Sequence, residues 1–327
     1  MSIAPYIKEI GRGARGARGI TREQAFDLMC QVLDGRASDL EVGAFAVAMR
    51  IKGETTDELA GFLDAVTARC IPVQPERPAV VLPSYNGARR LPNLTALLAQ
   101  LLAQEGVPVL VHGLGHDPGR VTTAEIFQNL GLPIAQTPAD IARAWSRREP
   151  VFMRTELLCP PLARLLEARW VIGLRNPGHT VAKLLDPCPP GLALRVVNYT
   201  HPEYAVSLSE FLAATRANAL LMRGTEGEPV ADARRTPKMD VFLGGELRAE
   251  LSVPQLEGSL AQVPLLPREH DAATTALYIQ AVASGEKPAP APLLRQVECL
   301  LRTLGELPGA APSAAAAVAA GEAHAAG

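Results

Sequence analysis

The sequence contains few aromatic residues, no paired cysteine motif, no long apolar run and almost no net charge. Aromatic side chains make up 4% of the 327 residues, so we expect a core of Leu, Val and Ala and little base stacking on any nucleic acid. The five cysteines are scattered without a Cys-x-x-Cys pair, which argues against a zinc site or a disulfide framework. No apolar run approaches the roughly twenty residues of a membrane span, and the first residues lack the apolar core of a signal peptide. We therefore expect a cytoplasmic protein that does not contact membranes.

The formal net charge of −2 excludes a protein that is basic over its whole surface, but the charge is unevenly distributed. Residues 1–22 carry five basic side chains and one acidic side chain. Within them, the tract Gly11–Gly19 is too rich in glycine to hold a helix. Its Arg12, Arg15 and Arg18 are spaced for contact with a polyanion. The alternative is a flexible loop that its charges keep solvated.

Helix signals dominate the first seventy residues. Three Ser/Thr-x-x-Glu/Gln capping boxes predict helices that begin at Thr21, Ser38 and Thr55. The second of these helices carries one apolar stripe, formed by Leu40, Ala44, Val47, Ala48 and Ile51. A proline-rich connector over residues 71–78 follows.

From Ala79 onward, short apolar runs alternate with helix-like segments. The strand 79–82, the helix 94–104 and the strand 107–111 form a βαβ unit, which implies a parallel sheet. Further strands are expected at 194–197, 219–222 and 239–243, and further helices at 122–130, 160–169, 180–185, 206–216, 272–283 and 293–303. The predicted fold class is α/β, with a small all-helical domain beside a larger α/β domain that has a central, mainly parallel sheet. Residues from about 309 onward are rich in Ala, Gly and Pro and are expected to be disordered.

The loop Pro83–Thr95 follows the first strand and is the main candidate for a ligand site. A loop between a strand's end and a helix's start can hold anions, because free backbone N–H groups and the helix dipole point there. Asn86-Gly87 predicts a tight turn, and Arg89 and Arg90 add two positive charges. The functional interpretation is a site for phosphate, and the alternative is an ordinary turn with two solvated arginines. A second glycine-rich loop, 112–120, should open on the same edge of the sheet.

Motifs for metal binding or nucleophilic catalysis are missing. His112 and His116 are four residues apart but span two glycines, so no helix places them on one face. No nucleophile elbow or Walker-type loop is present, and Cys159 precedes two prolines and is expected to be buried. We therefore assign no catalytic residue.

Motifs spread along nearly the whole chain resemble the anthranilate phosphoribosyltransferase family of glycosyltransferases (glycosyltransferase family 3). They are Leu33-Asp34-Gly35, Val47-Ala48-Met49-Arg50-Ile51-Lys52-Gly53-Glu54-Thr55 and Val111-His112-Gly113. The resemblance implies a helical domain at 1–71, joined by about 155–186, and an α/β domain made of 72–154 and 187–308. A phosphoribosyl-pyrophosphate site would lie between them, and 309–327 would form a tail.

The chain departs from that family where the family's chemistry resides. The family's diphosphate loop Gly-Thr-Gly-Gly-Asp reads Pro83-Ser84-Tyr85-Asn86-Gly87 here, and its Lys-His-Gly-Asn-Arg-Ser reads Val111-His112-Gly113-Leu114-Gly115-His116. The family's Asp-Glu pair for magnesium would fall near Glu228, where no such pair is kept. A diphosphate leaving group needs its charge neutralised, so we do not expect anthranilate phosphoribosyl transfer.

The replacement motifs resemble the YbiB-type branch of the same family. They are Ile7-Lys8-Glu9-Ile10-Gly11-Arg12-Gly13, Pro83-Ser84-Tyr85-Asn86-Gly87-Ala88-Arg89, His201-Pro202-Glu203-Tyr204 and Arg223-Gly224-Thr225-Glu226-Gly227-Glu228. This resemblance implies homodimers that lack transferase activity and bind nucleic acid with little sequence preference.

Two main hypotheses follow. The first is a homodimeric nucleic-acid-binding protein that uses phosphate contacts, favours DNA over RNA and needs no cofactor or metal. Its candidate contacts are Arg12, Arg15, Arg18, Arg89, Arg90, Arg175 and Lys183. The second is a phosphoribosyltransferase or phosphorylase with a changed, unknown acceptor, for which magnesium would be the only cofactor. Its candidate cleft residues are Ser84, Asn86, Gly87, Asn93, Thr95, His112 and Gly113. A third hypothesis is a non-catalytic binder of a nucleotide-like ligand.

Overall fold

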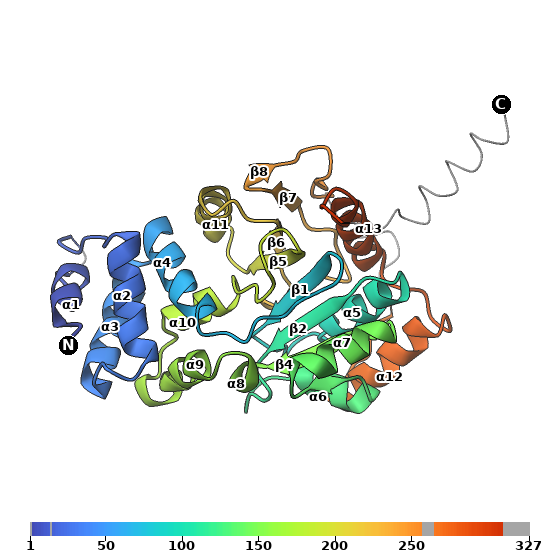
Figure 1. Ribbon diagram of the computed structural model, residues 1–327. Coiled ribbons are helices and arrows are strands. Elements are labelled where there is room, and N and C mark those ends of the chain that lie inside the picture. The colour runs from blue at the N-terminus through green and yellow to red at the C-terminus, as the bar shows by residue number, and fades with distance from the viewer. Residues whose placement is uncertain (1, 14, 257–264, 310–327) are drawn as a thin grey trace.

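The computed structural model describes residues 2–13, 15–256 and 265–309 (Figure 1). The tail expected to be disordered, from about residue 309, lies beyond the described residues except for its first position. The helices are α1 (Ala4–Ile10), α2 (Arg22–Leu33), α3 (Asp39–Lys52), α4 (Thr56–Thr67), α5 (Thr95–Gln104), α6 (Thr123–Leu130), α7 (Pro138–Ser146), α8 (Thr155–Leu158), α9 (Pro160–Ile172), α10 (Pro177–Ala182), α11 (Glu203–Ala214), α12 (Ala272–Ala283) and α13 (Ala291–Gly305). The strands are β1 (Ala79–Ser84), β2 (Val109–Gly113), β3 (Ile134–Ala135), β4 (Val151–Arg154), β5 (Ala193–Tyr199), β6 (Ala219–Arg223), β7 (Met239–Leu243) and β8 (Glu246–Leu247).

Helices α1 to α4 form a bundle at one end of the molecule (Figure 1). The three predicted capping boxes are present, with Thr21, Ser38 and Thr55 each accepting the backbone N–H of the residue three positions on. Helix α2 packs along α4, and α1 packs on α3. Later in the chain, α9 packs on α2, and α10 packs on α3 and α4. The prediction of an all-helical first segment is confirmed, and the described helices are too short or too polar to cross a membrane.

The apolar stripe predicted on α3 faces solvent. Phe45 and Met49 turn toward the bundle and are fully buried. Leu40 is 84% exposed and Ile51 is 66% exposed, with Val47 between them on the same face. Helix α3 therefore has a second apolar face that no described part of the chain covers.

The sheet has eight strands in the order β3-β4-β2-β1-β5-β6-β7-β8. The strands from β3 to β6 are parallel, and β7 and β8 are antiparallel. The predicted βαβ unit is confirmed as β1–α5–β2. Strands β3 and β4 were not predicted from the sequence, because two and four residues are too short to show a strand pattern. The short helix expected at 180–185 begins earlier, because Asn176 caps it and Pro177 occupies its first turn.

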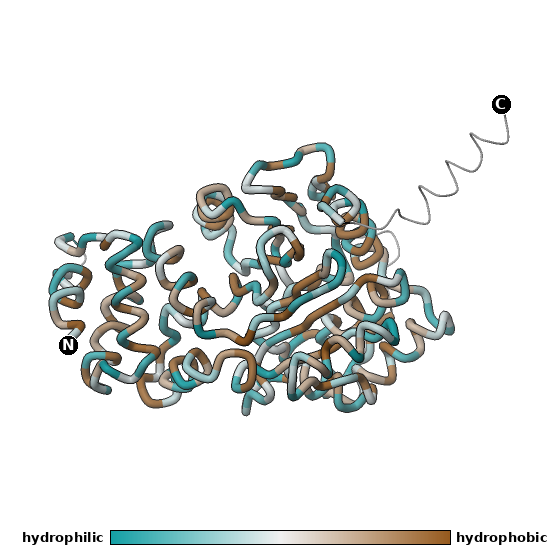
Figure 2. The backbone as a smooth tube through the Cα atoms, viewed as in Figure 1, coloured by the Kyte–Doolittle hydropathy of each residue, from teal (hydrophilic) through white to brown (hydrophobic). Residues whose placement is uncertain are grey.

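Two buried clusters fill the two faces of the sheet. Val109 and Val111 point to the face covered by α5, α6, α12 and α13, whereas Leu110 points to the opposite face. The cluster that contains Leu110 is continuous with the core of the helical bundle. Figure 2 shows the strands as apolar stretches between hydrophilic loops. The chain builds outward from β1 in one direction and then from β5 in the other. The β1/β5 boundary is therefore a topological switch point, where α/β proteins form their ligand crevices.

Candidate anion-binding site

The first loop, residues 84–95, connects β1 to α5 beside this switch point. Ser84 lies opposite Gly113 of β2 in parallel register, so the two predicted loops do share one edge of the sheet. Gly87 has φ 64°, as the predicted tight turn requires. A Cβ atom on Gly87 would lie 2.9 Å from the carbonyl oxygen of Val121. The turn therefore packs directly on the second loop.

The amide groups of the first loop point at a carboxylate from the same chain. Glu228 Oε1 accepts the backbone N–H groups of Asn86 at 2.8 Å and Gly87 at 2.7 Å. Its Oε2 accepts hydroxyl groups from Ser84, from Thr95 at 3.5 Å and from Thr123 at 3.3 Å. Glu228 is 0% exposed. A buried side chain thus fills the position in which a phosphate oxygen would meet the loop.

Glu228 belongs to a tight turn after β6, residues 224–229, which we name the Glu loop. Its two central residues, Glu226 and Gly227, have φ of 53° and 87°, as a type I′ turn requires. The backbone N–H of Glu228 closes the turn on the carbonyl oxygen of Thr225 at 3.0 Å. The turn thus projects two carboxylates, those of Glu226 and Glu228, toward the first loop.

The carboxylate of Glu226 also accepts hydrogen bonds from the first loop. Three consecutive backbone N–H groups donate to it, from Arg89 at 3.2 Å, Arg90 at 2.8 Å and Leu91 at 2.9 Å. The Nδ2 of Asn86 donates to the carbonyl oxygen of Glu226 at 2.7 Å. The two loops are therefore joined by both side-chain and backbone hydrogen bonds.

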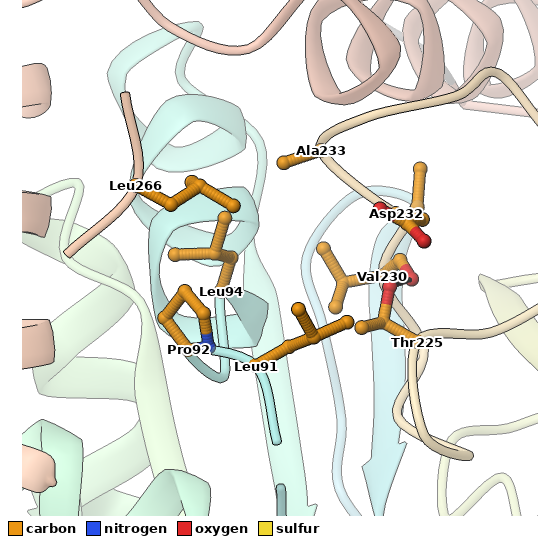
Figure 3. A pocket seen from close by; sticks show the side chains of 9 residues that line it. Leu91, Pro92, Leu94, Thr225, Val230, Asp232, Ala233 and Leu266 are labelled. Carbon is orange, nitrogen blue, oxygen red and sulfur yellow. Dashed lines mark hydrogen bonds between the residues drawn. The ribbon is translucent and has the colours of Figure 1, made fainter. Parts of the chain in front are cut away.

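Apolar contacts join the same two loops on their other side. Figure 3 shows Leu91, Pro92 and Leu94 of the first loop facing Thr225 and Val230. The cavity between them has a volume of about 10 Å³, about the space of one water molecule. This pocket is a packed contact rather than a ligand site.

An open cleft lies beside the joined loops, and its lining is basic. The cleft has a volume of about 660 Å³, and we name it the arginine cleft. It is lined by Asn86, Arg89, Arg90, Leu91, Arg120, Arg175, Thr200, His201, Glu226 and Arg234. Five arginines and one carboxylate thus line the cleft, and that carboxylate is bound by backbone N–H groups. The cleft is suited to bind an anion larger than a single phosphate.

Burial and mutual repulsion lower the pKa of Arg175, which lines the cleft, and of Lys183, which lies nearby. Arg175 donates to Asn86 Oδ1 at 2.7 Å, and burial together with Arg169 and Arg120 lowers its pKa. Lys183 donates to the carbonyl oxygen of Gly227 at 3.2 Å, and burial lowers its pKa to about 8. These groups would gain from a bound anion, which would offset the cost of keeping them charged away from water.

Four of the predicted cleft residues come together around Glu228 rather than around an open space: Ser84, Asn86, Gly87 and Thr95. The other three, Asn93, His112 and Gly113, lie beside them with other partners. Asn93 Nδ2 donates to Thr123 Oγ1 at 3.0 Å, next to Thr95. His112 is fully buried between the hydroxyl of Tyr85 at 2.9 Å and the carbonyl oxygen of Leu185 at 3.2 Å, and burial lowers its pKa to about 4. The neighbouring Gly113 lies so close to Ser84 that no side chain fits there. His112 is therefore neutral and has a packing role in this arrangement.

The predicted nucleic-acid contacts fall into two separate groups. Arg89, Arg90 and Arg175 line the arginine cleft, and Lys183 lies near them. The tract that contains Arg12, Arg15 and Arg18 follows α1 at the outer end of the bundle, on the side away from the sheet (Figure 1). Arg12 is paired with Glu9 there at 2.6 Å. The two groups thus belong to different elements, the outer end of the helical bundle and the loops at the sheet edge.

Sequence reasoning missed the acidic half of the site. Glu226 and Glu228 lie more than 100 positions from their partners in the chain, and no local pattern reveals such contacts. The visible signal was the Thr-Glu-Gly-Glu turn at the end of a buried strand. Arg120 and Arg234 of the cleft were also not predicted.

The residues present do not fit the magnesium ion of the family's reaction. The oxygens of Glu226 and Glu228 already accept N–H and O–H groups, and a cation cannot share oxygens that face so many donor protons. In the part of the chain that the structure describes, no group of three or more His, Cys, Asp or Glu side chains is placed to hold a metal.

The helical bundle, the mainly parallel sheet and the loops at its switch point define a protein with a phosphoribosyltransferase-like fold. The described bundle, at residues 4–70, matches the family model for the glycosyl transferase family, helical bundle domain. The chain is 40% identical over 309 residues to the uncharacterized protein YbiB of Escherichia coli K12, and the aligned part covers 94% of this chain and 95% of that one. It is 28% identical over 291 residues to the anthranilate phosphoribosyltransferase of Rhizobium rhizogenes, covering 88% and 83% of the two chains. The chain belongs to the anthranilate phosphoribosyltransferase-like proteins of glycosyltransferase family 3.

Solved structures agree on the fold. The anthranilate phosphoribosyltransferase of Thermus thermophilus superposes with a TM-score of 0.67 at 21% identity, over 92% of this chain and 90% of that one. The enzyme of Saccharomyces cerevisiae in complex with PRPP and Mg gives a TM-score of 0.60 at 13% identity, over 92% and 95%. At these identities the likeness concerns the architecture alone.

Proposed function

We propose that this protein binds nucleic acid through phosphate contacts in the arginine cleft, and that it does not transfer phosphoribosyl groups. The observation that carries the proposal is the combination of an open cleft lined by five arginines with an anion loop closed by Glu228. A volume of about 660 Å³ lies within the range of about 300–1,000 Å³ that is common for small-ligand sites. The cleft can thus take a nucleotide-sized part of a longer chain.

The buried carboxylate of Glu228 argues against the transferase hypothesis. A bound diphosphate would need the N–H groups of Asn86 and Gly87, which Glu228 already occupies. It would also meet a negative charge at contact distance, in a place that water does not screen. Transfer would therefore require the Glu loop to be expelled from the core.

We further propose that the protein is a homodimer that pairs through α3. The support is the exposed apolar stripe of Leu40, Val47 and Ile51, which a second copy would cover. A dimer would present two arginine clefts and two Arg12–Arg18 tracts to one polyanion, and linked sites bind more tightly than single ones. DNA is our proposed partner, and RNA is an outcome that the test below distinguishes.

The test is a fluorescence-anisotropy titration with labelled single-stranded DNA, double-stranded DNA and RNA between about 50 and about 200 mM salt. We expect binding that weakens steeply with salt. The double variant Arg89→Ala/Arg90→Ala should flatten the slope of log K against log salt by roughly 1.4–1.8, if both residues contact phosphate. The triple variant Arg12→Ala/Arg15→Ala/Arg18→Ala tests the tract at the outer end of the bundle.

The matched control is Arg143→Ala/Arg147→Ala, which removes two largely exposed arginines from and just after α7. This variant should bind as the native protein does. An absence of binding at low salt, or an equal loss in the control variant, would contradict the proposed function.

A further inference from the structure

Glu226 differs from Glu228 in one respect that matters for ligands. Both carboxylates are held by N–H groups of the first loop, but Glu228 is buried whereas Glu226 is partly exposed and lines the arginine cleft. A ligand that enters the cleft therefore reaches Glu226 without any opening of the core.

The N–H groups that hold Glu226 form an anion site in their own right. The backbones of Arg89, Arg90 and Leu91 converge on one carboxylate with donor–acceptor distances of 2.8–3.2 Å. Consecutive N–H groups that converge in this way bind phosphate as readily as carboxylate. Arg89 and Arg90 of the same segment line the cleft, so their guanidinium groups and these backbone N–H groups lie at one site.

The backbone of Glu226 is strained in this position. Its φ of 53° is unfavourable for a residue that has a side chain. Gly227, the next residue, is packed against Asn86, so the turn itself stays in place when the side chain of Glu226 moves. The side chain is partly exposed to the cleft, so it can leave the N–H groups by rotation about its own bonds while the turn is kept.

We propose that Glu226 is a built-in competitor for phosphate in the arginine cleft, and that a nucleic-acid phosphate displaces it from the N–H groups of Arg89, Arg90 and Leu91. The inference rests on the proposed function and specifies how the same site is regulated. No bond is made or broken, because one oxyanion replaces another. Without an incoming anion, Glu226 neutralises part of the cleft and disfavours weak or singly charged ligands. A polyanion that also engages the arginines gains enough to displace it.

The experiment compares Glu226→Ala and Glu226→Gln with the native chain. The probes are labelled single-stranded DNA, followed by anisotropy, and inorganic pyrophosphate, followed by calorimetry and by the shift in melting temperature. We expect Glu226→Ala to bind DNA about tenfold more tightly, because three backbone N–H donors no longer serve an internal carboxylate and the cleft loses a negative charge. Glu226→Gln should show a smaller gain, since it keeps one acceptor oxygen and loses the charge. Both variants should bind pyrophosphate more tightly than the native chain.

Glu246→Ala is the matched control, because it removes an exposed carboxylate from β8, at the sheet edge. It should leave both affinities unchanged. If a folded Glu226→Ala protein bound pyrophosphate and DNA no more tightly than the native chain, the competitor role would be overturned. DNA binding by the native chain would in that case still support the proposed function. If the native chain failed to bind DNA but Glu226→Ala gained pyrophosphate binding, the proposed function would fail and the competitor role would stand.

Discussion

Glu228 Oε1 accepts the backbone N–H of Gly87 at 2.7 Å, across 141 positions of the chain. The contact brings the end of β6 onto the loop after β1 and passes over the edge of the intervening β5. The backbone N–H groups of this loop, which could bind an external anion, are thereby occupied by a carboxylate of the same chain. The charge that would make a ligand site is used for stability, and the neighbouring arginine cleft is the place left for an external anion.

Removal of the Glu228 carboxylate should therefore unfold the site rather than open it. Glu228→Ala leaves the N–H groups of Asn86 and Gly87 without an acceptor in a dry environment. We expect a loss of about 3–5 kcal/mol in the free energy of unfolding, measured by urea denaturation. Glu228→Gln should lose only about 1–2 kcal/mol, because its amide can still accept from the backbone and donate to Ser84 Oγ.

An added anion should partly restore the Glu228→Ala protein. Millimolar pyrophosphate would supply the missing acceptor and raise the melting temperature of this variant more than that of the native chain. Equal shifts in both proteins, or a Glu228→Ala protein as stable as the native one, would show that Glu228 does not hold the first loop in place.

The contact between the Glu loop and the first loop makes a second prediction, about Gly227. A Cβ atom at this position would lie 1.9 Å from Asn86 Nδ2, and its φ of 87° is unfavourable for alanine. Gly285 has a similar φ of 81° but no heavy atom within 4 Å of its Cβ position. Gly285→Ala should therefore cost about 1 kcal/mol, and Gly227→Ala roughly 3 kcal/mol or more, since one of the loops has to move. Equal losses in urea denaturation would mean that the two loops are not interlocked.

Local signals in the sequence were sufficient for the elements but not for the site. The capping boxes at Thr21, Ser38 and Thr55 and the unit β1–α5–β2 are specified by residues close together in the chain, and they were predicted correctly. The position of the first loop between a strand and a helix was also predicted correctly, because it is a local property. Its occupant was not, because Glu228 reaches it only after the strand order of the sheet is set. The same limit applies to α3, where an apolar stripe does not reveal whether it faces this chain or solvent.

Lys183 gives the arginine cleft a predicted dependence on pH. Burial lowers its pKa to about 8, whereas nearby Glu228 raises it and Arg175 and Arg120 lower it further. Above pH 8 the amine loses its charge, so the affinity for DNA should fall by roughly three- to tenfold between about pH 7 and pH 9. Lys183→Arg should remove this dependence, because an arginine stays charged throughout that range.

The stability of the native chain should change in the opposite direction over this pH range. An unfolded lysine has a pKa of about 10.4, so between about pH 8 and that value the unfolded state binds more protons than the folded state. The Lys183 contribution to stability then rises with pH. Weaker binding at pH 9 together with an unchanged or higher melting temperature would identify lost charge as the cause. A flat binding profile in the native chain would mean that Lys183 does not act on the bound phosphate.

The exposed stripe on α3 makes a prediction about assembly. Leu40 and Ile51 are 84% and 66% exposed, and on a monomer they would keep contact with water at a cost of roughly 25 cal/mol for each Å² of apolar surface. Leu40→Asp/Ile51→Asp should convert the proposed dimer into a monomer in analytical ultracentrifugation, with little change in urea denaturation of the protomer, because neither side chain is part of the core. Leu277→Asp on α12 is the matched control, since Leu277 is also 66% exposed but lies on the far domain. The monomeric variant should bind long DNA more weakly and with a shallower salt dependence, because half of the arginine clefts are lost from each particle. A native chain that sediments as a monomer at micromolar concentration would rule out pairing through α3 and leave each cleft to act alone.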